Sequence, residues 1–559
     1  MTSLDLLIVV VFSVIVIITG LSFTGSGKNM QSFFAAGGAI PWYINGLSLF
    51  MGFFSAGTFV VWGSIAYSQG FVAIAIQWTM AFAGFAVGLF IAPAWHKNRA
   101  LTAASYINRR LGSFTQKTYT YLFLFISLFT TGSFLYPVAR IVQVASGYPI
   151  ELCILLLGGA SVLYVAAGGL WAVVVTDVLQ FVILFSVVVV VALLSWFKVD
   201  GLSGLTSVVP ADFFNLVNQE FSLTFILAFA LYNLFFLGGN WAYVQRYTST
   251  AKPADARKSA WLFGTLYLVS PVLWMLPPML YRAINNNLTG LEAEGAYLLI
   301  CKEVLPSGML GLMIGGMVFA TASSLNSILN VSAGVITQDV YPYFFGKASN
   351  RRLINVARIS TILLGVLAIA VALMVKQMGG IVNVVITIAA LTGVPLYLPV
   401  VWSLFSRRQT GMSVLFATVG GLSINLLLKF GGPFIGLNMS RAGEMLIGVL
   451  SPLFILVSFE LYFLLTGKYD PKYDTYRTEI DATLITNEAD AKVSQQENRY
   501  GKKVIGISVS ISSAIIVILG LFATHGRWII AVVGLLLLMA GLFIWLKNTK
   551  KRYDKGSRV

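Results

Sequence analysis

The sequence predicts an all-α polytopic membrane protein with about fifteen transmembrane helices. Of its 559 residues, 58% are hydrophobic and only 10% are charged, and the mean hydropathy is +0.84, which is more apolar than a soluble domain. About 20 apolar residues cross a bilayer as one helix, and the chain has many runs of that kind. They begin near residues 4, 41, 72, 118, 150, 172, 222, 259, 307, 353, 380, 412, 442, 504 and 528.

The first apolar run is expected to be a retained helix. LDLLIVVVFSVIVIITGLSF begins at Leu4, has no basic segment before it and is longer than the apolar part of a cleaved signal peptide.

Alternate loops are rich in Lys and Arg, which predicts that they face the cytoplasm. The loops between them, around Asp200 and Glu292, are acidic or mixed. We therefore expect a multi-pass protein of the cell (inner or plasma) membrane, with its N-terminus outside and the tail KNTKKRYDKGSRV inside. The basic loop positions are Lys97, Arg99, Arg109, Arg110 and Lys117, then Arg246, Lys252, Arg257 and Lys258, then Lys347, Arg351, Arg352 and Arg358, then Arg407 and Arg408.

Charge and residue usage argue against several other classes of protein. The net charge of +16 belongs to loops that face anionic lipid, so no nucleic-acid partner is expected. Two cysteines and two histidines, at no recognisable spacing, provide neither a disulfide framework nor a multi-ligand metal site. The chain has no Walker-type loop and no acid/base or nucleophile pair, so we expect neither an ATP-driven pump nor an enzyme.

Two of the predicted helices carry paired glycines within their spans. Gly52 and Gly57 bracket four residues of the second run, and Gly238 and Gly239 lie inside the seventh, five helices later. Helices broken at corresponding positions are typical of an inverted repeat, here with helices two to six and seven to eleven as its halves. The alternative is that these glycines only permit close helix packing.

The ninth apolar run contains an unusual number of polar residues, in MVFATASSLNSILN at 317–330. Ala320, Ser323, Ser324 and Ser327 share one helix face because they follow i, i+3, i+4 and i+7 spacing. Neutral hydroxyls, together with carbonyls freed by a broken helix, are oxygen ligands suited to a hard cation such as Na⁺. The alternative is that these serines mediate helix contacts or bond to their own helix carbonyls.

The sixth run, VVVTDVLQFVILF, places Asp177 inside the membrane or at the cytoplasmic end of the span. An ionisable group at that depth is by default a functional candidate. An aspartate that reaches cytoplasmic water is the alternative.

Three segments resemble a known family. ATASSLNSILNVSAGVITQDVY resembles the ninth-helix signature of the sodium/solute symporter family, GGLWAVVVTDVLQFV its helix-six segment, and NWAYVQRYTSTAKPADARKSAW its cytoplasmic QR motif. The resemblance covers about residues 1–465, with the motifs in order. Within the family, the chain is similar in kind to the sodium/sugar cotransporters. The resemblance implies Na⁺-coupled uptake and a leucine-transporter-type five-plus-five inverted repeat with additional flanking helices.

The resemblance also implies two sets of sodium ligands. The main site would use the carbonyls of Met51, Phe54 and Ala320 and the hydroxyls of Ser323 and Ser324. A possible second site would use Asp177, Ser323, Asn326 and Ser327, with the Asn326 amide oxygen in place of the family's usual hydroxyl.

The positions that match the family's substrate site are neutral hydrogen-bonding groups and two aromatic residues: Ser55, Thr58, Gln77, Asn233, Phe236 and Tyr267. Such a set suits a hydroxylated solute, because each hydroxyl can donate and accept while a ring stacks on the solute. Ordinary packing is the alternative for the two aromatic residues, and Phe236 is also the candidate inner gate.

Departures from the family pattern narrow the expected substrate. Galactose-type relatives have a glutamate at the position of Gln77 and a lysine at that of Tyr267, whereas the sialic-acid branch has an arginine where this chain has Thr130. The set therefore favours an uncharged sugar or polyol. Sialic acid, another organic acid or an amino acid remains the alternative, as does a transporter-fold sensor that works with a partner.

The expected organisation follows from these assignments. The partners are a small-molecule solute, Na⁺ and membrane lipid, and nothing in the sequence indicates an oligomeric state. The expected parts are an N-terminal extra helix (1–40), the two halves (41–198 and 199–406), additional helices (407–466), a flexible cytoplasmic linker (467–502), and C-terminal helices with a basic tail (503–559).

Overall fold

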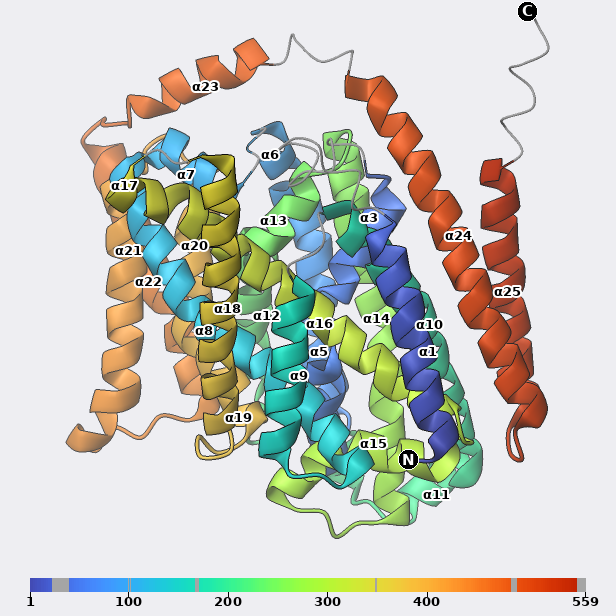
Figure 1. Ribbon diagram of the computed structural model, residues 1–559. Helices are drawn as coiled ribbons and strands as arrows, with labels where there is room; N and C mark the ends of the chain where they lie inside the picture. Colours follow the sequence, from blue (N-terminus) through green and yellow to red (C-terminus); the bar gives the residue numbers. More distant parts are fainter. Residues whose placement is uncertain are drawn as a thin grey trace, which may run out of the picture.

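The protein, seen in a computed structural model, is described for residues 1–22, 40–98, 100, 102–165, 170–346, 349–483 and 490–549 (Figure 1). Within these ranges it is helical, and the only extended pairing is an isolated bridge between Ile40 and Thr250. Eleven of the described helices are long and apolar enough to cross a membrane, or up to twelve if one bent pair counts as a span. The predicted all-α membrane fold is confirmed.

The number of fifteen spans stays a prediction. The eleven long apolar helices account for eleven of the expected spans, and the bent pair Leu223–Gly239 and Trp241–Thr248 corresponds to a twelfth. The other three correspond to the broken segment at 42–69 and to the shorter apolar helices Ile150–Gly159 and Met309–Leu325.

The first part of the chain begins with α1 (Ser3–Leu21). A broken helix made of α3, η2 and α4 comes next, followed by the elements up to η4. The elements are α3 (Trp42–Met51), the π-helical turn η2 (Thr58–Trp62), α4 (Gly63–Gln69), α5 (Val72–Ala86), η3 (Val87–Ile91), α6 (Ala92–Lys97), α7 (Ala103–Leu111), α8 (Ser113–Ser146), α9 (Ile150–Val165), α10 (Leu170–Lys198), α11 (Gly201–Thr206) and η4 (Ala211–Phe214).

The second part repeats the pattern of a broken helix followed by long ones. Its elements are α12 (Leu223–Gly239), α13 (Trp241–Thr248), α14 (Pro253–Ile284), η5 (Gly290–Gly295), α15 (Ala296–Val304), α16 (Met309–Val335), η6 (Ile336–Val340), α17 (Tyr341–Phe345), α18 (Asn350–Met374), α19 (Ile381–Ile388), η7 (Ala389–Gly393) and α20 (Val394–Ser403).

The remaining helices flank these two parts. They are α21 (Gly411–Leu426), η8 (Leu427–Gly431), η9 (Gly432–Ile435), α22 (Arg441–Leu465), α23 (Lys472–Thr483), α24 (Asp490–Phe522) and α25 (Arg527–Thr549). Figure 1 shows α24 and α25 as a hairpin at one edge of the bundle.

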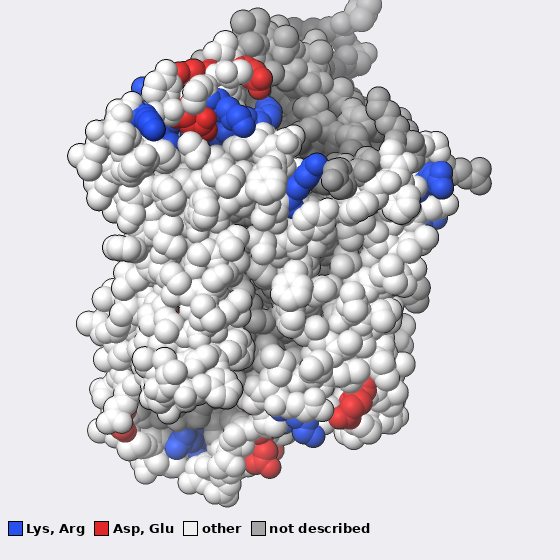
Figure 2. Space-filling model, turned by 90° about the vertical axis from the view of Figure 1, so that its left-hand side faces the viewer, with Lys and Arg blue, Asp and Glu red and all other residues white. Residues whose placement is uncertain are grey.

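Charged side chains gather at the two ends of the molecule. Figure 2 shows Lys, Arg, Asp and Glu at the top and bottom of one face, with a broad band between them that is almost free of charge. Burying charge in hydrocarbon is unfavourable, so this distribution is the one expected of a protein that spans a bilayer.

Both glycine-marked helices are broken. Helix α3 ends at Met51 with Gly52 as its C-cap, and α12 ends at Gly239, after which α13 turns away by 57°. The glycines also permit close packing, since a Cβ on Gly52 would lie 3.0 Å from the Tyr243 ring and one on Gly239 would lie 2.8 Å from Cβ of Tyr397. These glycines therefore both mark a helix break and permit close packing.

Helix α1 is fixed to elements that come much later in the chain. The Asp5 carboxylate is buried and accepts hydrogen bonds from the backbone N–H groups of Gly308 (2.7 Å) and Gly311 (3.1 Å), at the N-terminus of α16. A carboxylate there satisfies helix N–H groups that have no partner within the helix. Near the other end of α1, the hydroxyls of Thr19 and Ser508 lie 2.9 Å apart.

Most of the described residues of the predicted linker at 467–502 are helical, and its flexibility stays a prediction. Lys472–Thr483 form α23, and residues from Asp490 onward belong to α24. Tyr476 and Ile480 of α23 are buried, and the Tyr476 ring packs against Tyr106 of α7 at 5.8 Å. Two apolar contacts one turn apart dock this otherwise polar helix.

Arg110, which the sequence places in a basic loop, lies on helix α7. Its side chain is fully buried, bonds to the Asp470 carboxylate at 2.7 Å and donates to the carbonyls of Ser406 (3.0 Å) and Gln409 (3.1 Å). One guanidinium therefore joins α7, the α20–α21 loop and the start of the α23 segment.

We predict that Arg110→Met lowers the free energy of unfolding in detergent by at least about 3 kcal/mol, because it leaves Asp470 as a buried charge without its partner. Chemical denaturation followed by tryptophan fluorescence measures the change. Arg109→Met is the matched control, since the neighbouring Arg109 is exposed. Equal stability of the two variants would contradict a structural role for the buried pair.

Candidate sodium and substrate sites

The break after α3 releases backbone groups that must find partners elsewhere. The N–H of Ala56 donates to Oγ1 of Thr321 at 3.0 Å, and the Thr321 hydroxyl donates to the Met317 carbonyl within α16. Oγ of Ser324 lies 3.4 Å from the Gly52 carbonyl oxygen and 3.3 Å from that of Ala320. Helix α16 therefore supplies side chains to both sides of the break.

The five predicted main-site sodium residues come from two elements, the broken segment and α16. Met51 and Phe54 are buried on either side of Gly52, whose carbonyl faces Ser324. Ala320 and Ser324 thus lie directly across from the break. The Ser323 hydroxyl donates to the Asp177 carboxylate at 2.5 Å.

Asp177 is the centre of a buried polar network. Besides Ser323, it accepts a hydrogen bond from the Ser48 hydroxyl at 2.6 Å and lies 3.7 Å from Nη2 of Arg246. Nε of Arg246 in turn donates to Ser48 at 3.1 Å. With Asp177 only 2% exposed, the alternative of an aspartate that reaches open water is wrong.

The basic loop that contains Arg246 also needs correction. Arg246 lies on α13 with 5% of its surface exposed, so it is an internal partner of Asp177 and not a surface charge. The backbone carbonyl of Arg246 accepts from Nδ2 of Asn45 at 2.8 Å, which ties α13 to α3. Asn326 and Ser327, the other predicted ligands of a second sodium site, have side chains outside the described residues.

Ser48, Arg246, Thr321 and Tyr243 are site neighbours that the sequence interpretation missed. The hydroxyl of Tyr243 donates to the Gly52 carbonyl at 3.4 Å. The QR motif did mark Arg246, but only as part of a family signature. Ser48 carried a signal too, since it lies one helical turn before Gly52 on the same helix.

The predicted substrate residues form two local groups. Ser55 and Thr58 lie at the break, where Oγ1 of Thr58 accepts from the Ser55 N–H at 3.3 Å and donates to the Phe53 carbonyl at 3.0 Å. Gln77 is buried on α5. Asn233 of α12 donates to Oγ1 of Thr79 on α5 at 2.7 Å, whereas its buried Oδ1 has no hydrogen-bond partner within the described part of the chain.

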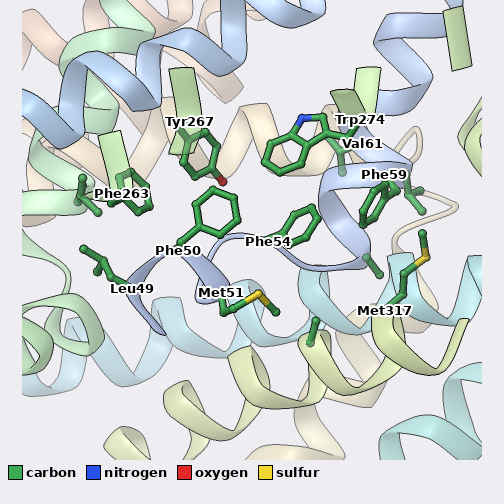
Figure 3. Packing of buried hydrophobic residues seen from close by; sticks show 14 of the residues in the cluster. Leu49, Phe50, Met51, Phe54, Phe59, Val61, Phe263, Tyr267, Trp274 and Met317 are labelled. Carbon is green, nitrogen blue, oxygen red and sulfur yellow. The ribbon is translucent and has the colours of Figure 1, made fainter. Parts of the chain in front are cut away.

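An aromatic cluster surrounds the broken segment. Phe53 stacks on Tyr243 (4.5 Å between centroids) and meets Phe236 edge-on at 5.6 Å. On the other side, Figure 3 shows Phe50 and Phe54 pointing toward Tyr267 and Trp274 of α14. The Phe54 and Trp274 rings stack at 4.6 Å, and Phe50 lies 5.1 Å from Tyr267.

A small cavity of about 30 Å³ lies next to the candidate sodium residues. Its volume fits about two water molecules, at roughly 10–15 Å³ of such volume per water. The lining includes Ser48, Gly52, Phe236, Tyr243, Arg246 and Ser324. It therefore connects the main-site hydroxyl to the partners of Asp177, and Phe236 forms part of its wall.

Two broken helices at the centre of a helical membrane protein, with neutral oxygens gathered at one break, define the class of leucine-transporter-fold Na⁺-coupled transporters. Solved structures agree with this fold. A substrate-bound, outward-open Na⁺-coupled sialic acid symporter has a TM-score of 0.71 at 19% identity, over 82% of this chain and 98% of that one. MHP1, a nucleobase-cation-symport-1 family transporter, has a TM-score of 0.53 at 13% identity, over 84% and 99%.

The chain belongs to the sodium:solute symporter family, whose family model matches residues 33–421. Its curated relatives include the sodium/glucose cotransporter of Vibrio parahaemolyticus, 25% identical over 513 residues, which are 84% of this chain and 92% of that protein. The sodium/myo-inositol cotransporter 2 of Oryctolagus cuniculus is 25% identical over 473 residues, covering 76% and 70%. The recognition of the family from its motifs is confirmed, and with it the coupling to Na⁺.

We predict that Asp177 and Arg246 are energetically coupled. Arg246→Met alone should destabilise the protein by about 3 kcal/mol or more, because a buried charge loses its partner. Adding Asp177→Asn should restore part of that loss, giving an interaction energy of at least about 1 kcal/mol in the double-mutant cycle. Lys252→Met, at an exposed position of the following loop, is the control for loss of a positive charge. Strict additivity would argue against the pairing.

Proposed function

We propose that the protein is a secondary active symporter that imports an uncharged sugar or polyol together with Na⁺ by alternating access. The observation that supports this most directly is the position of the Ser324 hydroxyl, which lies within 3.4 Å of two carbonyl oxygens, one from the broken helix and one from α16. A cation at this point would draw the two elements together.

Sodium would be held by neutral oxygens in the main site. The carbonyls of Met51, Phe54 and Ala320 and the hydroxyls of Ser323 and Ser324 would replace its water without adding a buried negative charge. Ser323 would have to turn from Asp177 toward the ion. Occupancy of this site would therefore loosen one contact of the Asp177 network.

Asp177 would serve a second sodium site, with Ser323, Asn326 and Ser327. Its charge is now shared with Arg246 at 3.7 Å and with two hydroxyls. A cation that reaches Asp177 would compete with the guanidinium. Because of this competition, we expect Na⁺ to bind the second site weakly and only briefly on its way to the cytoplasm.

The substrate would bind beside the break, among Ser55, Thr58, Gln77, Asn233, Phe236 and Tyr267. The unpartnered Oδ1 of Asn233 is an acceptor that a solute hydroxyl can satisfy. Tyr267 lies among Phe50, Phe263 and Trp274, so ring contact and packing would be combined there.

Charge and relatives support an uncharged substrate. The relatives include cotransporters of glucose and of myo-inositol, which are uncharged polyhydroxylated solutes. Thr130, which lines the small cavity, bonds to its own helix at Ile126 and brings no positive charge. The second candidate substrate is sialic acid, favoured by the fold similarity to a sialic acid symporter.

Transport would be driven by the sodium gradient. One Na⁺ gains about 2.3 kcal/mol per 100 mV of membrane potential and about 1.4 kcal/mol per tenfold concentration difference. The sum of about 3.7 kcal/mol supports roughly 500-fold accumulation of a neutral solute. Phe236, which meets Phe53 and Tyr397 edge-on, would be the inner gate.

The orientation of the chain would place the N-terminus outside and the C-terminus in the cytoplasm of the cell membrane. One end of the molecule carries α7, α13 and the basic loops. That end would face the cytoplasm, because loops rich in Lys and Arg prefer the inner side of the membrane.

Uptake into proteoliposomes tests the proposal. We expect one labelled neutral sugar or polyol to accumulate with an inward Na⁺ gradient and not with an inward choline gradient. The panel includes glucose, galactose, myo-inositol, sialic acid and proline. Sodium-driven uptake of sialic acid or proline alone would overturn the substrate class but retain the symporter.

We predict that Ser324→Ala raises the Na⁺ concentration for half-maximal uptake by about tenfold or more, since an ion ligand is lost and about 1.4 kcal/mol corresponds to a factor of ten. Ser332→Ala removes a hydroxyl from the same helix, where it bonds to Ser127, and is the matched control. Unchanged sodium activation in Ser324→Ala would refute the main-site assignment.

A further inference from the structure

One carboxylate holds three separate elements together at the end of the molecule opposite the basic loops. Glu294 of η5 is 4% exposed. Its Oε1 accepts from the backbone N–H of Ile381, the first residue of α19, at 3.1 Å, and its Oε2 accepts from the Tyr136 hydroxyl of α8 at 3.3 Å. The loop helix, α8 and α19 therefore meet at a single side chain.

Arg140 strengthens the same junction. It lies one turn along α8 from Tyr136, and its Nε is 4.0 Å from Oε2 of Glu294. Its Nη2 donates to the carbonyl of Leu291, also in η5, at 2.8 Å. Nε itself is buried and makes no hydrogen bond to any described residue, while Nη1 donates to Oε1 of Gln143 at 2.6 Å.

The backbone at Gly380 is shaped to receive this carboxylate. Gly380 has φ +87°, and a Cβ there would lie 2.8 Å from Oε1 of Glu294. A side chain is therefore excluded both by conformation and by space. The start of α19 can approach Glu294 only because this residue is glycine.

The junction lies against the half of the broken helix that follows the break. Tyr297, one turn after Glu294, packs its ring on Phe59 of η2 at 4.5 Å. Phe59, Val60, Arg140, Glu294, Tyr297 and Met317, among others, meet at one junction that leaves no room for a water molecule. Phe59 is the residue after Thr58, so this junction lies beside one of the candidate substrate residues.

We propose that Glu294 is the outer gate residue of the transporter, which locks η5 and α15 over the broken helix by bonding to α8 and α19 at once. The inference rests on the proposed function and orientation, which place η5 outside. Solute can reach Thr58 from outside only when η5 leaves α8 and α19. Opening hydrates both Glu294 and Arg140, which offsets the lost bonds and makes the lock reversible.

Truncation of Glu294 should favour the open state. It leaves the Ile381 N–H, the Tyr136 hydroxyl and the Arg140 guanidinium without their shared partner in the closed state. Removing Arg140 acts in the same direction, because it leaves the buried carboxylate uncompensated.

The test is the accessibility of a cysteine placed at this closed junction. Val60→Cys places a thiol on the broken helix, and a charged, membrane-impermeant thiosulfonate is applied to intact cells without added solute. Each variant without Val60→Cys is its own blank, because Cys153 and Cys301 are buried here but Cys301 lies on α15, which the proposed opening moves. We expect Glu294→Ala to raise the outside labelling rate of Val60→Cys about tenfold, and Glu292→Ala, which alters an exposed carboxylate on the same short helix, to leave it unchanged.

Arg140→Gln is the second variant, in case Glu294→Ala does not fold, and it should raise the rate in the same direction. Labelling within twofold of the parent rate in variants that elute normally on gel filtration would overturn the lock. Labelling from the cytoplasmic side alone would overturn its outer location. Because the readout uses no solute, a failed uptake panel would refute the proposed function without altering the labelling result.

Discussion

The structure depends on how a membrane protein satisfies the backbone groups that a broken helix exposes. In hydrocarbon, irregular backbone is tolerated only where protein or a water-filled cavity receives its N–H and C=O groups. At this break the Gly52 carbonyl is met by Tyr243 of α13 and Ser324 of α16, and the Ala56 N–H donates to Thr321 of α16. The polar face of α16 is therefore required by the break, and the same oxygens become available to an ion.

A second constraint is that the charges near the break must neutralise one another. Asp177 lies on α10 and Arg246 on α13, and Ser48 of α3 bonds to both. Such a network is stable only when every member keeps a partner. Because α3 and α13 share this network, it provides a physical link through which movement of one broken helix can displace the other.

Periodicity, glycine placement and apolar length predicted the helical membrane fold, the two breaks and the polar face of α16, because each of these is a local property of the chain. The partnership of Asp177 with Arg246 and Ser48 was not predictable in this way, since it joins residues 69 and 129 positions apart in the sequence. The docking of α23 was missed because a helix held by Tyr476 and Ile480 alone shows no amphipathic pattern. Arg110 and Arg246 were assigned to charged loops, but both lie on helices and their guanidinium groups are buried by tertiary structure.

The attachment of α1 has a consequence for the biogenesis of the protein. Its Asp5 carboxylate requires the N–H groups of Gly308 and Gly311, and its Thr19 hydroxyl meets Ser508, so the partners of the first helix are synthesised some 300 and 490 residues later. Until then Asp5 must stay at the aqueous surface, where a carboxylate is hydrated. Helix α1 can thus enter the membrane first and yet complete its assembly last, when the C-terminal hairpin closes over it.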